Sequence, residues 1–282
     1  MSRITFGVDF GLSVTDAVKA ADGQVLAHVA RHRPGPASPA LLQRMLSEVT
    51  ASLFTPDTGG AVVGVTGGRS RDLPGTSGGH KVVHVSETDA VARGGLRLAG
   101  VTSALVVSCG TGTAMVAADS QAGRYVHASG TAVGGGTLEG LAKHLLGARD
   151  ASAVARLATQ GDSAGVDTTL GEVLGGGIGH LPAAATAVNL GRLAELADPD
   201  PADLAAGLVT LVGQTIALVA LNAAKVAGME RTVFVGRLAE FEAVTRVIRS
   251  VFDLYGVEHP LFPAGAGMAT AFGAALTVAE NT

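Results

Sequence analysis

One local pattern occurs twice in the chain and limits the folds that it can adopt. An apolar strand, a turn of glycine and small residues, and a second apolar strand occupy residues 4–19, and the same order returns in residues 104–119. Recurrence of this kind is the sequence signature of an internal structural duplication. It predicts two related domains, 1–100 and 101–282, in the 282-residue chain.

Predicted strands alternate with predicted helices between and after the two copies. Further strands are expected at 61–68, 82–85 and 231–236, and helices at 38–54, 87–98, 151–159, 202–227, 238–254 and 264–279. Ser86, followed three residues later by Asp89, resembles a capping box that begins the second of these helices. Alternation of strands and helices is typical of the α/β class.

Composition excludes several classes of function. The chain carries 20 Lys and Arg against 24 Asp and Glu and shows no basic stripe, so neither nucleic acid nor a membrane surface is an expected partner. The single cysteine, Cys109, cannot form an internal disulfide, hold zinc or anchor an iron–sulfur cluster by itself. The longest apolar stretch, 208–228, is interrupted by Gln214, Asn222 and Lys225, which favours a buried helix over a membrane span. With no signal core at its start, the chain is expected to be cytoplasmic.

Three glycine-rich turns follow apolar strands, at 9–13, 109–113 and 130–137. Such turns bring backbone N–H groups close to a phosphate, and Ser or Thr hydroxyls add further donors. Glycine turns are also ordinary hairpin chemistry, so each one alone is a weak signal. The third turn leads into a predicted helix, whose N-terminus would favour an anion. The Walker A and Rossmann patterns are both absent.

Two carboxylates lie beside these predicted turns. Asp9 ends the first strand, where it could hold the water shell of Mg²⁺ on ATP phosphates or cap a turn. We favour the metal, because the duplicated turn at 109–113 would supply the opposing wall for the phosphates. Glu87 lies in the first turn of a predicted helix, where it could accept a hydroxyl proton or simply complement the helix dipole.

Beyond single residues, several longer motifs occur in the order and at the spacing of one known family. They are GVDFGLSVTDAV near the start, SETDAVARG (86–94), VVSCGTGTAM (106–115), SGTAVGGGTLEGLAKHLLG (129–147), GDSAGVD (161–167), RTVFVGRL (231–238) and AFGAAL (271–276). With these motifs the chain resembles the type II pantothenate kinases, within the superfold of sugar kinases, Hsp70 and actin. The resemblance covers nearly the whole chain.

The resemblance implies two ribonuclease H-like domains that clasp ATP and Mg²⁺ and phosphorylate the primary hydroxyl of pantothenate. It implies that Glu87 is the catalytic base and that Asp9 holds Mg²⁺ through water. The family's second-domain helices form a homodimer, which is therefore also implied here. Positions matching the family's nucleotide contacts are Gly11, Ser13, Gly110, Thr111, Gly112, Thr113, Gly134, Gly135, Gly136, Thr137 and Gly236.

The sequence also departs from the family's pattern around the acceptor. In the first turn Leu12 replaces a glycine, and Asp16 stands where lysine is usual. Ala114 replaces a small hydroxyl residue, and His127 occupies the place of an arginine that helps to form the acceptor pocket. Residues expected around the acceptor are Glu87, Thr111, Gly112, Ala114, Arg124, His127 and Gly130. Loss of a fixed cation and gain of a carboxylate would weaken binding of an anionic acceptor.

Three functions therefore remain open. The first is a pantothenate kinase in which His127 or Arg124 replaces the family arginine. The second is a kinase of the same build that acts on another small alcohol. The third is a nucleotide-binding pseudokinase with a regulatory role, against which the retained Glu87 and phosphate turns argue. Iron–sulfur ATPase activators and zinc-containing repressor-type sugar kinases share the superfold but need more cysteines than this chain has.

Overall fold

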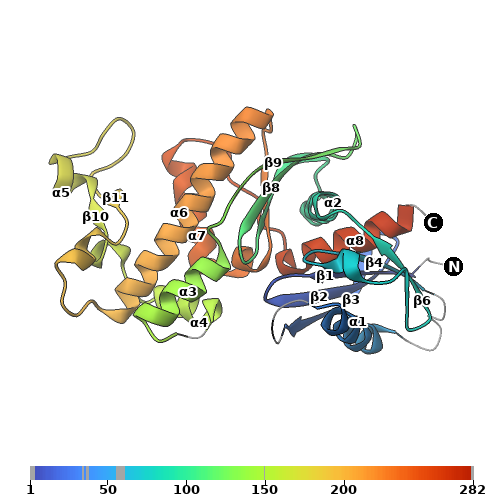
Figure 1. Ribbon diagram of the computed structural model, residues 1–282. Helices are drawn as coiled ribbons and strands as arrows, with labels where there is room; N and C mark the ends of the chain where they lie inside the picture. The colour runs from blue at the N-terminus through green and yellow to red at the C-terminus, as the bar shows by residue number, and fades with distance from the viewer. Residues whose placement is uncertain (1–3, 34, 36–37, 55–60, 149, 281–282) are drawn as a thin grey trace.

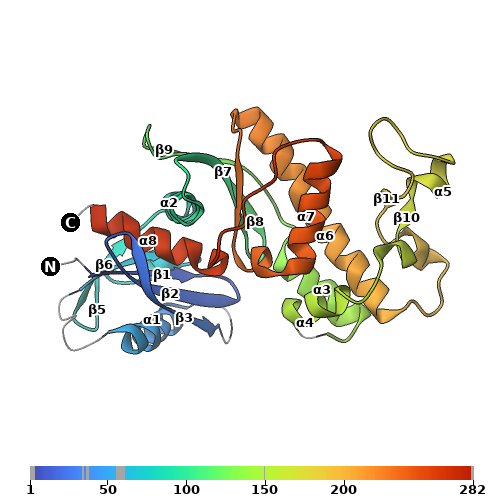
Figure 2. The ribbon, with the colours of Figure 1, turned by 180° about the vertical axis from the view of Figure 1, so that it is seen from behind.

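Two β-sheets form two lobes that lie side by side in the computed structural model (Figure 1). The structure describes residues 4–33, 35, 38–54, 61–148 and 150–280. Helices α2 (Glu87–Ala99) and α8 (Ala269–Glu280) lie between the lobes, as the view from behind also shows (Figure 2). The C-terminal helix therefore returns to the part of the fold where the chain begins.

The first sheet has the strand order β3-β2-β1-β4-β6-β5. These strands are β1 (Ile4–Phe10), β2 (Val14–Ala21), β3 (Gln24–His32), β4 (Val62–Thr66), β5 (Thr76–Ser77) and β6 (His80–His84). β1, β2 and β3 form an antiparallel meander, whereas β4 and β6 run parallel to β1. Helix α1 (Pro39–Leu53) covers one face, where Phe6, Val8 and Phe10 pack with Leu42 and Val49 in one core cluster.

The second sheet repeats the central topology of the first. Its order is β12-β7-β8-β9, with β7 (Ser103–Cys109), β8 (Thr113–Asp119), β9 (Arg124–Thr131) and β12 (Thr232–Val235). β7, β8 and β9 again form an antiparallel meander, and β12 runs parallel to β7 as β4 does to β1. Helices α6 (Pro201–Ala227) and α7 (Glu242–Leu254) pack beside this sheet (Figure 1). The predicted duplication is confirmed in this shared strand order.

Close backbone contacts join the two lobes through α2 and α8. A Cβ on Gly273 of α8 would lie 1.8 Å from the Ala90 carbonyl oxygen of α2, and one on Gly94 would lie 1.9 Å from the Ala269 carbonyl oxygen. α8 touches the first sheet in the same way, since a Cβ on Gly7 would lie 1.9 Å from the Ala271 carbonyl oxygen. Glycine at these positions lets the two helices and the sheet approach closely.

The remaining elements extend the second lobe. α3 (Gly135–Leu145) and α4 (Ala151–Ala158) pack near α6, and β10 (Thr168–Thr169), α5 (Leu170–Leu174) and β11 (Thr186–Val188) form a projection at the end away from the first lobe (Figure 1). Buried Asp167 anchors the projection, because its carboxylate accepts hydrogen bonds from Leu190 N at 2.8 Å and Thr186 Oγ1 at 3.0 Å. Short 3-10 turns are η2 (Ser70–Asp72), η3 (Ser163–Gly165), η4 (Gly191–Ala194), η5 (Arg237–Glu240) and η6 (Ala266–Met268).

Two predicted helices begin later than the sequence pattern suggested. The helix predicted from 238 starts at Glu242, and the one predicted from 264 starts at Ala269, because a 3-10 turn precedes each. Gly236 and Gly265 have positive φ values of 88° and 73°, which break the helical path before these turns. The division into domains at residue 100 stays a prediction, and the packing of α8 on β1 shows that the last helix serves the first lobe.

Helix α6 is long and apolar enough to cross a membrane by length and composition, and no other described helix is. In its most apolar 18-residue window 67% of the residues are buried inside the protein, against α4, α7 and the second sheet. That burial is typical of the core helix of a folded domain.

The glycine contact between α2 and α8 gives a test of the fold. Gly273→Ala should lower the free energy of unfolding by about 1–3 kcal/mol, because the added methyl group overlaps the Ala90 carbonyl. Gly140→Ala in α3 is the control, since no heavy atom lies within 4 Å of its added Cβ, and it should stabilise by about 0.5–1 kcal/mol. Urea unfolding followed by circular dichroism measures both, and equal stabilities for the two variants would contradict the packing.

Candidate active site

The carboxyl ends of three parallel strands bring acidic residues together in the first lobe. β1, β4 and β6 end at one edge of the sheet, where Asp9 lies in β1 and Glu87 begins α2 directly after β6. Ser86 caps α2, since its Oγ accepts a hydrogen bond from Asp89 N at 3.0 Å and donates one to Asp89 Oδ2 at 2.7 Å. The predicted cap of this helix is confirmed, and it fixes the position of the first helical turn, which carries the Glu87 side chain.

The second lobe presents the glycine turns at the matching edge of its sheet. The turn 110–112 follows β7, the segment 132–134 follows β9, and Gly236 follows β12. Because β7, β9 and β12 run in the same direction, all three segments emerge at the carboxyl edge. A Cβ on Gly236 would lie 2.5 Å from the Cys109 carbonyl oxygen, so only glycine lets the end of β12 rest on the start of the turn 110–112.

The glycines 134–136 at the start of α3 hold this segment against the turn 110–112. Gly135 N donates to the Gly110 carbonyl at 2.8 Å, and Gly136 N donates to the Thr111 carbonyl at 2.9 Å. A Cβ on Gly134 would lie 2.6 Å from that same Thr111 oxygen. These two amides at the start of α3 are therefore engaged within the protein. Within the described residues, the hydrogen bonds of this region give no acceptor to the amides of Thr111 and Gly112.

The hydroxyl groups predicted to face the nucleotide divide into two pairs. Thr113 Oγ1 donates to the Val133 carbonyl at 2.9 Å, and Thr137 Oγ1 accepts from Gly134 N and donates to the Ala132 carbonyl, both at 3.3 Å. These two hydroxyls hold the turns in shape. Ser13 Oγ and Thr111 Oγ1 instead lie 3.2 Å apart and join the two lobes.

Contacts across the lobes show that the three predicted turns converge. Besides Ser13 and Thr111, Arg237 Nη2 of the second lobe lies 2.8 Å from Asp16 Oδ1 and 3.0 Å from Oδ2 of the first. His28 Nε2 in β3 lies 2.8 Å from the same Asp16 Oδ1. The segments 9–13, 109–113 and 134–137, remote in sequence, therefore meet at the junction of the two lobes, which we call the cleft.

The electrostatics at the floor of this cleft are those of a crowded acidic site. Burial raises the pKa of Asp9 from 3.8 to about 8, with further rises from the nearby carboxylates of Asp16 and Glu87 and a lowering from Arg237. Asp9 and Asp16 are directly opposed on β1 and β2. Such an arrangement favours a bound cation, which would relieve the repulsion among the carboxylates.

Within the described part of the chain, no group of three or more His, Cys, Asp or Glu side chains is arranged to hold a metal ion by itself. The carboxylates of Asp9, Asp16 and Glu87 suit Mg²⁺ bound to a nucleotide better than a metal ion held by the protein alone, since phosphate oxygens and water would complete its coordination. Cys109 is buried below the turn, and its burial raises the pKa of the thiol to about 12. A thiol of that kind is a packing residue and not a nucleophile.

Of the residues predicted around the acceptor, those on β8 and β9 occupy two separate places. Ala114 pairs with Gly130 across the strands next to the turn, and a Cβ on Gly130 would lie 3.8 Å from His127 Nε2, so these three positions are neighbours. The structure does not bring Arg124 to them. Arg124 begins β9 opposite Asp119, at the end of the strand away from the turns, and is exposed.

Sequence reasoning missed two side chains that the structure places at the cleft, Arg237 and His28. Both bind Asp16. The departure at Asp16 was visible in the sequence, but nothing local connects position 16 with position 237. Only the structure shows the need for these partners, since residue Asp16 is 6% exposed and a buried carboxylate needs a partner.

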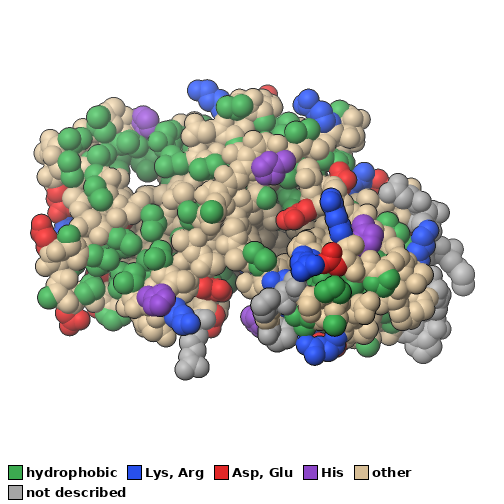
Figure 3. Space-filling view, viewed as in Figure 1, with side chains coloured by type: hydrophobic (Ala, Val, Ile, Leu, Met, Phe, Trp, Pro, Cys, Tyr) green, Lys and Arg blue, Asp and Glu red, His purple; other side chains and the backbone are tan. Residues whose placement is uncertain are grey.

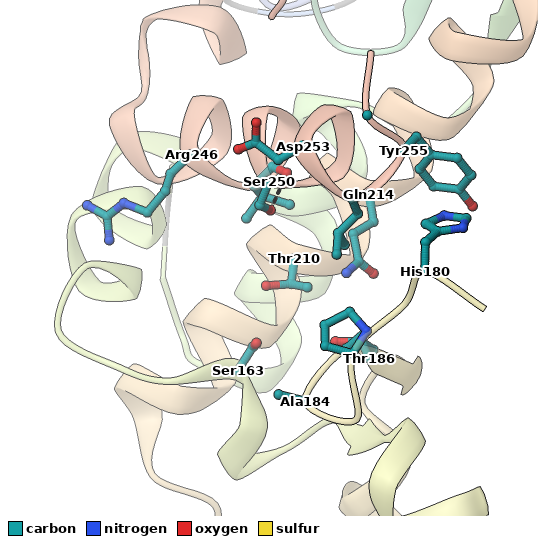
Figure 4. Close-up of a pocket in the computed structure, with 15 residues that line it drawn as sticks. Ser163, His180, Ala184, Thr186, Thr210, Gln214, Arg246, Ser250, Asp253 and Tyr255 are labelled. Atoms are coloured by element: carbon teal, nitrogen blue, oxygen red, sulfur yellow. Dashed lines mark hydrogen bonds between the residues drawn. The ribbon is translucent and has the colours of Figure 1, made fainter. Parts of the chain in front are cut away.

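A second hollow lies elsewhere in the second lobe. It measures about 990 Å³ and lies between the projection and helices α6 and α7, where Figure 4 shows Gln214, Tyr255 and His180 on one side and Ser163 on the other. None of the predicted site residues lines it. Figure 3 shows that apolar side chains are frequent on the projection, whereas charged ones are more frequent on the first lobe.

Comparison with solved structures shows the same fold. The activator of the 2-hydroxyisocaproyl-CoA dehydratase from Clostridium difficile, solved with bound ADPNP, matches with a TM-score of 0.69 at 17% identity, over 99% of this chain and 95% of that one. A ROK family glucokinase from Streptomyces griseus matches with a TM-score of 0.57 at 19% identity, over 98% and 99%. The predicted α/β superfold of actin, Hsp70 and the sugar kinases is confirmed.

Comparison of sequences identifies the family. A type II pantothenate kinase from Bacillus cereus is 27% identical over 232 residues, which are 80% of this chain and 83% of that protein. One from Oceanobacillus iheyensis is 28% identical over 178 residues, or 61% and 65% of the two chains. The family model described as Fumble matches residues 96–277. The chain therefore belongs to the Fumble family, the family of the type II pantothenate kinases.

Proposed function

We propose that this protein transfers the γ-phosphoryl group of ATP to the primary hydroxyl of pantothenate, giving 4′-phosphopantothenate in the first step of coenzyme A biosynthesis. The observation that carries the proposal is the convergence of Glu87 and Asp9 with the turn 110–112 across one cleft. Family membership supports the reaction class. The residues around the cleft offer a candidate base, candidate phosphate donors and a candidate metal site.

Glu87 is the proposed general base. It is exposed at the first turn of α2, and its charge reaches Asp9 strongly enough to raise the pKa of that residue. A carboxylate there can accept the proton of the acceptor hydroxyl as its oxygen attacks the γ-phosphorus. The cap made by Ser86 holds the start of α2 and so keeps this carboxylate at the cleft.

The nucleotide phosphates are proposed to lie between the first turn, Gly11 to Ser13, and the turn 110–112. The amides of Thr111 and Gly112 and the hydroxyls of Ser13 and Thr111 are the donors available there. Hydrogen bonds from Gly135 N and Gly136 N join the segment 134–137 to this turn, and Thr113 Oγ1 donates to the neighbouring Val133 carbonyl. These residues hold the turn in shape. Gly236 borders the same turn from β12, where the adenosine would lie.

Asp9 is proposed to hold Mg²⁺ through water. When bound, the ion neutralises phosphate charge and lowers the barrier to attack by the acceptor oxygen. Without a cation the carboxyl of Asp9 is half protonated near pH 8, and Asp16 and Glu87 both oppose its ionisation. The protonated carboxyl of Asp9 therefore stabilises the folded protein, whereas the ionised carboxylate is the form that would bind the cation.

The raised pKa of Asp9 makes stability depend on pH. Its stabilising contribution is complete below its ordinary value of 3.8 and is lost as pH rises through about 8, because the folded protein resists its ionisation. Asp9→Asn cannot ionise, so it should raise Tm relative to the wild type, by little at pH 4 and by a margin worth about 1 kcal/mol or more at pH 8.5.

Differential scanning calorimetry of the protein without nucleotide or Mg²⁺, at intervals from pH 4 to pH 9, measures that margin. Asp198→Asn is the control, since this carboxylate is exposed and lies outside the cleft, in the segment before α6. A Tm difference between wild type and Asp9→Asn that stays constant over this range would contradict the assigned burial.

A kinase for a different small alcohol is the second candidate. Asp16 and His127 support it, because they stand where the family has lysine and arginine, and an anionic acceptor would lose those cations. Purified protein with ATP and Mg²⁺ should be tested against pantothenate, pantetheine, pantoate and hexoses. Phosphorylation of pantothenate supports the first proposal, and turnover of another alcohol supports the second. ATP binding without transfer to any acceptor would support a pseudokinase.

Glu87→Gln tests the base. The amide keeps the size of the side chain but cannot accept the proton, so kcat should fall by about 10²–10⁴-fold. Affinity for ATP should change less than about twofold, because the turns that bind the phosphates are untouched. Glu258→Gln, at an exposed carboxylate after α7 and outside the site, should keep kcat within about threefold. A coupled assay and calorimetric titration measure both, and unchanged turnover in Glu87→Gln would reject the base.

A homodimer formed through the second lobe is proposed as well. The projection, the segment between η4 and α6, and α6 itself expose large apolar side chains, which a second copy of the chain would remove from water. These are Val173 (55% exposed), Leu174 (56%), Ile178 (55%), Val188 (50%), Leu196 (40%), Leu218 (36%) and Val226 (90%).

Sedimentation equilibrium tests the dimer. The wild type should give twice the chain mass of 28.0 kDa, and Leu174→Asp should shift the equilibrium toward the monomer, because its carboxylate would be buried in the interface. Leu26→Asp on the first lobe, where Leu26 is 56% exposed, is the matched control and should remain dimeric. A monomeric wild type would contradict the proposal.

A further inference from the structure

The turn after β12 places the guanidinium of Arg237 where the predicted phosphate turns 9–13 and 110–112 meet. Gly236, with φ of 88°, rests on the backbone of Cys109 at the start of the turn 110–112. Leu238 is buried and lies beside Gly135 at the start of α3, 3.7 Å from the position of a Cβ there. Arg237 lies between these two anchored residues, so its backbone is held against the turn 110–112 and the start of α3.

The side chain of Arg237 leaves this anchor and crosses to the first lobe. Its Nη2 reaches both oxygens of Asp16, at 2.8 and 3.0 Å, and the side chain is 39% exposed. A guanidinium has five N–H donors in a planar fork. Within the described residues the side-chain contacts of Arg237 use one of its three nitrogens, so donors remain for a ligand in the cleft.

Asp16 is built to hold that guanidinium in place. Its side chain is 8% exposed and binds His28 Nε2 at 2.8 Å as well as Arg237. It lies opposite Asp9 on the neighbouring strand, and the charge of Arg237 lowers the pKa of Asp9. The guanidinium is thus held beside the carboxylate that is proposed to meet the metal–nucleotide complex.

We propose that Arg237 binds the phosphate chain of the nucleotide and that Asp16 and His28 are its positioning residues. The inference rests on the proposed ATP site. A triphosphate adds negative charge to a site that already contains the carboxyl groups of Asp9, Asp16 and Glu87. One Mg²⁺ neutralises only part of this total charge. Where the family carries a lysine on the second strand, this chain has Asp16 and draws a cation from the opposite lobe.

Titration of ATP and of AMP, both with Mg²⁺, into the wild type and Arg237→Met tests the contact. Methionine keeps much of the apolar stem and removes the charge. Affinity for ATP should fall by about tenfold or more, which is the loss of one charge-assisted hydrogen bond. Affinity for AMP should change less than about threefold. Arg246→Met is the control, because the Arg246 side chain is exposed and pairs with Glu242 on α7, and this variant should bind ATP as the wild type does.

A double variant separates the phosphate contact from a purely structural ion pair. Arg237→Met leaves Asp16 buried without its cation, which could lower affinity through the fold alone. Asp16→Asn/Arg237→Met removes both charges. If Arg237 binds phosphate, the double variant still binds ATP at least about tenfold more weakly than the wild type. Recovery of wild-type ATP affinity in the double variant, or an equal loss for ATP and AMP, would overturn the proposal.

The positioning role of Asp16 has its own readout. Asp16→Asn keeps the cation but loosens it, so KM for ATP should rise by about threefold or more while kcat for the acceptor changes less. Arg237→Lys should restore part of the ATP affinity lost in Arg237→Met, because it returns the charge without the fork. ATP binding without phosphorylation of any acceptor would reject the proposed function and leave the Arg237 result valid. Absence of ATP binding in the wild type would overturn both.

Discussion

Backbone contact between α2 and α8 is the constraint on which the rest of the molecule depends. Gly94 and Gly273 remove the side chains that would hold the two helices apart, and Gly7 lets α8 rest on β1. Gly95 continues the series toward the second sheet, where a Cβ on it would lie 2.4 Å from Val106 Cγ1. Main-chain contacts therefore fix α2 and α8 against each other and against β1, and the Val106 side chain fixes α2 against the second sheet. Together these contacts set the distance between the two sheets and the width of the cleft that they border.

The cleft gains its chemistry from topology more than from any single motif. Both sheets place the carboxyl ends of their parallel strands toward it, so the ends of β1 and β6 face those of β7 and β12. Acidic groups gather on one side and glycine turns with backbone donors on the other. Ser13 with Thr111 and Asp16 with Arg237 join the two sides, and both pairs use residues from the turns or next to them.

Much of this could be predicted from the sequence, because the duplicated strand–turn–strand pattern and the cap at Ser86 are local signals. The fold and the convergence of the turns followed from them and from the family resemblance. What sequence could not give depends on contacts across the lobes. Arg237 meets Asp16 only after 220 intervening residues have folded. The engagement of the Gly135 and Gly136 amides likewise depends on how closely α3 approaches the turn.

Cys109 has a practical consequence. It is the sole sulfhydryl in the chain, and it lies fully enclosed in the second sheet with its ionisation suppressed. Because the thiol is buried and its pKa is raised, a thiol reagent should modify it mainly in molecules whose second sheet has opened. The rate of labelling therefore reports how often this lobe opens, with no engineered probe and no second thiol in the chain.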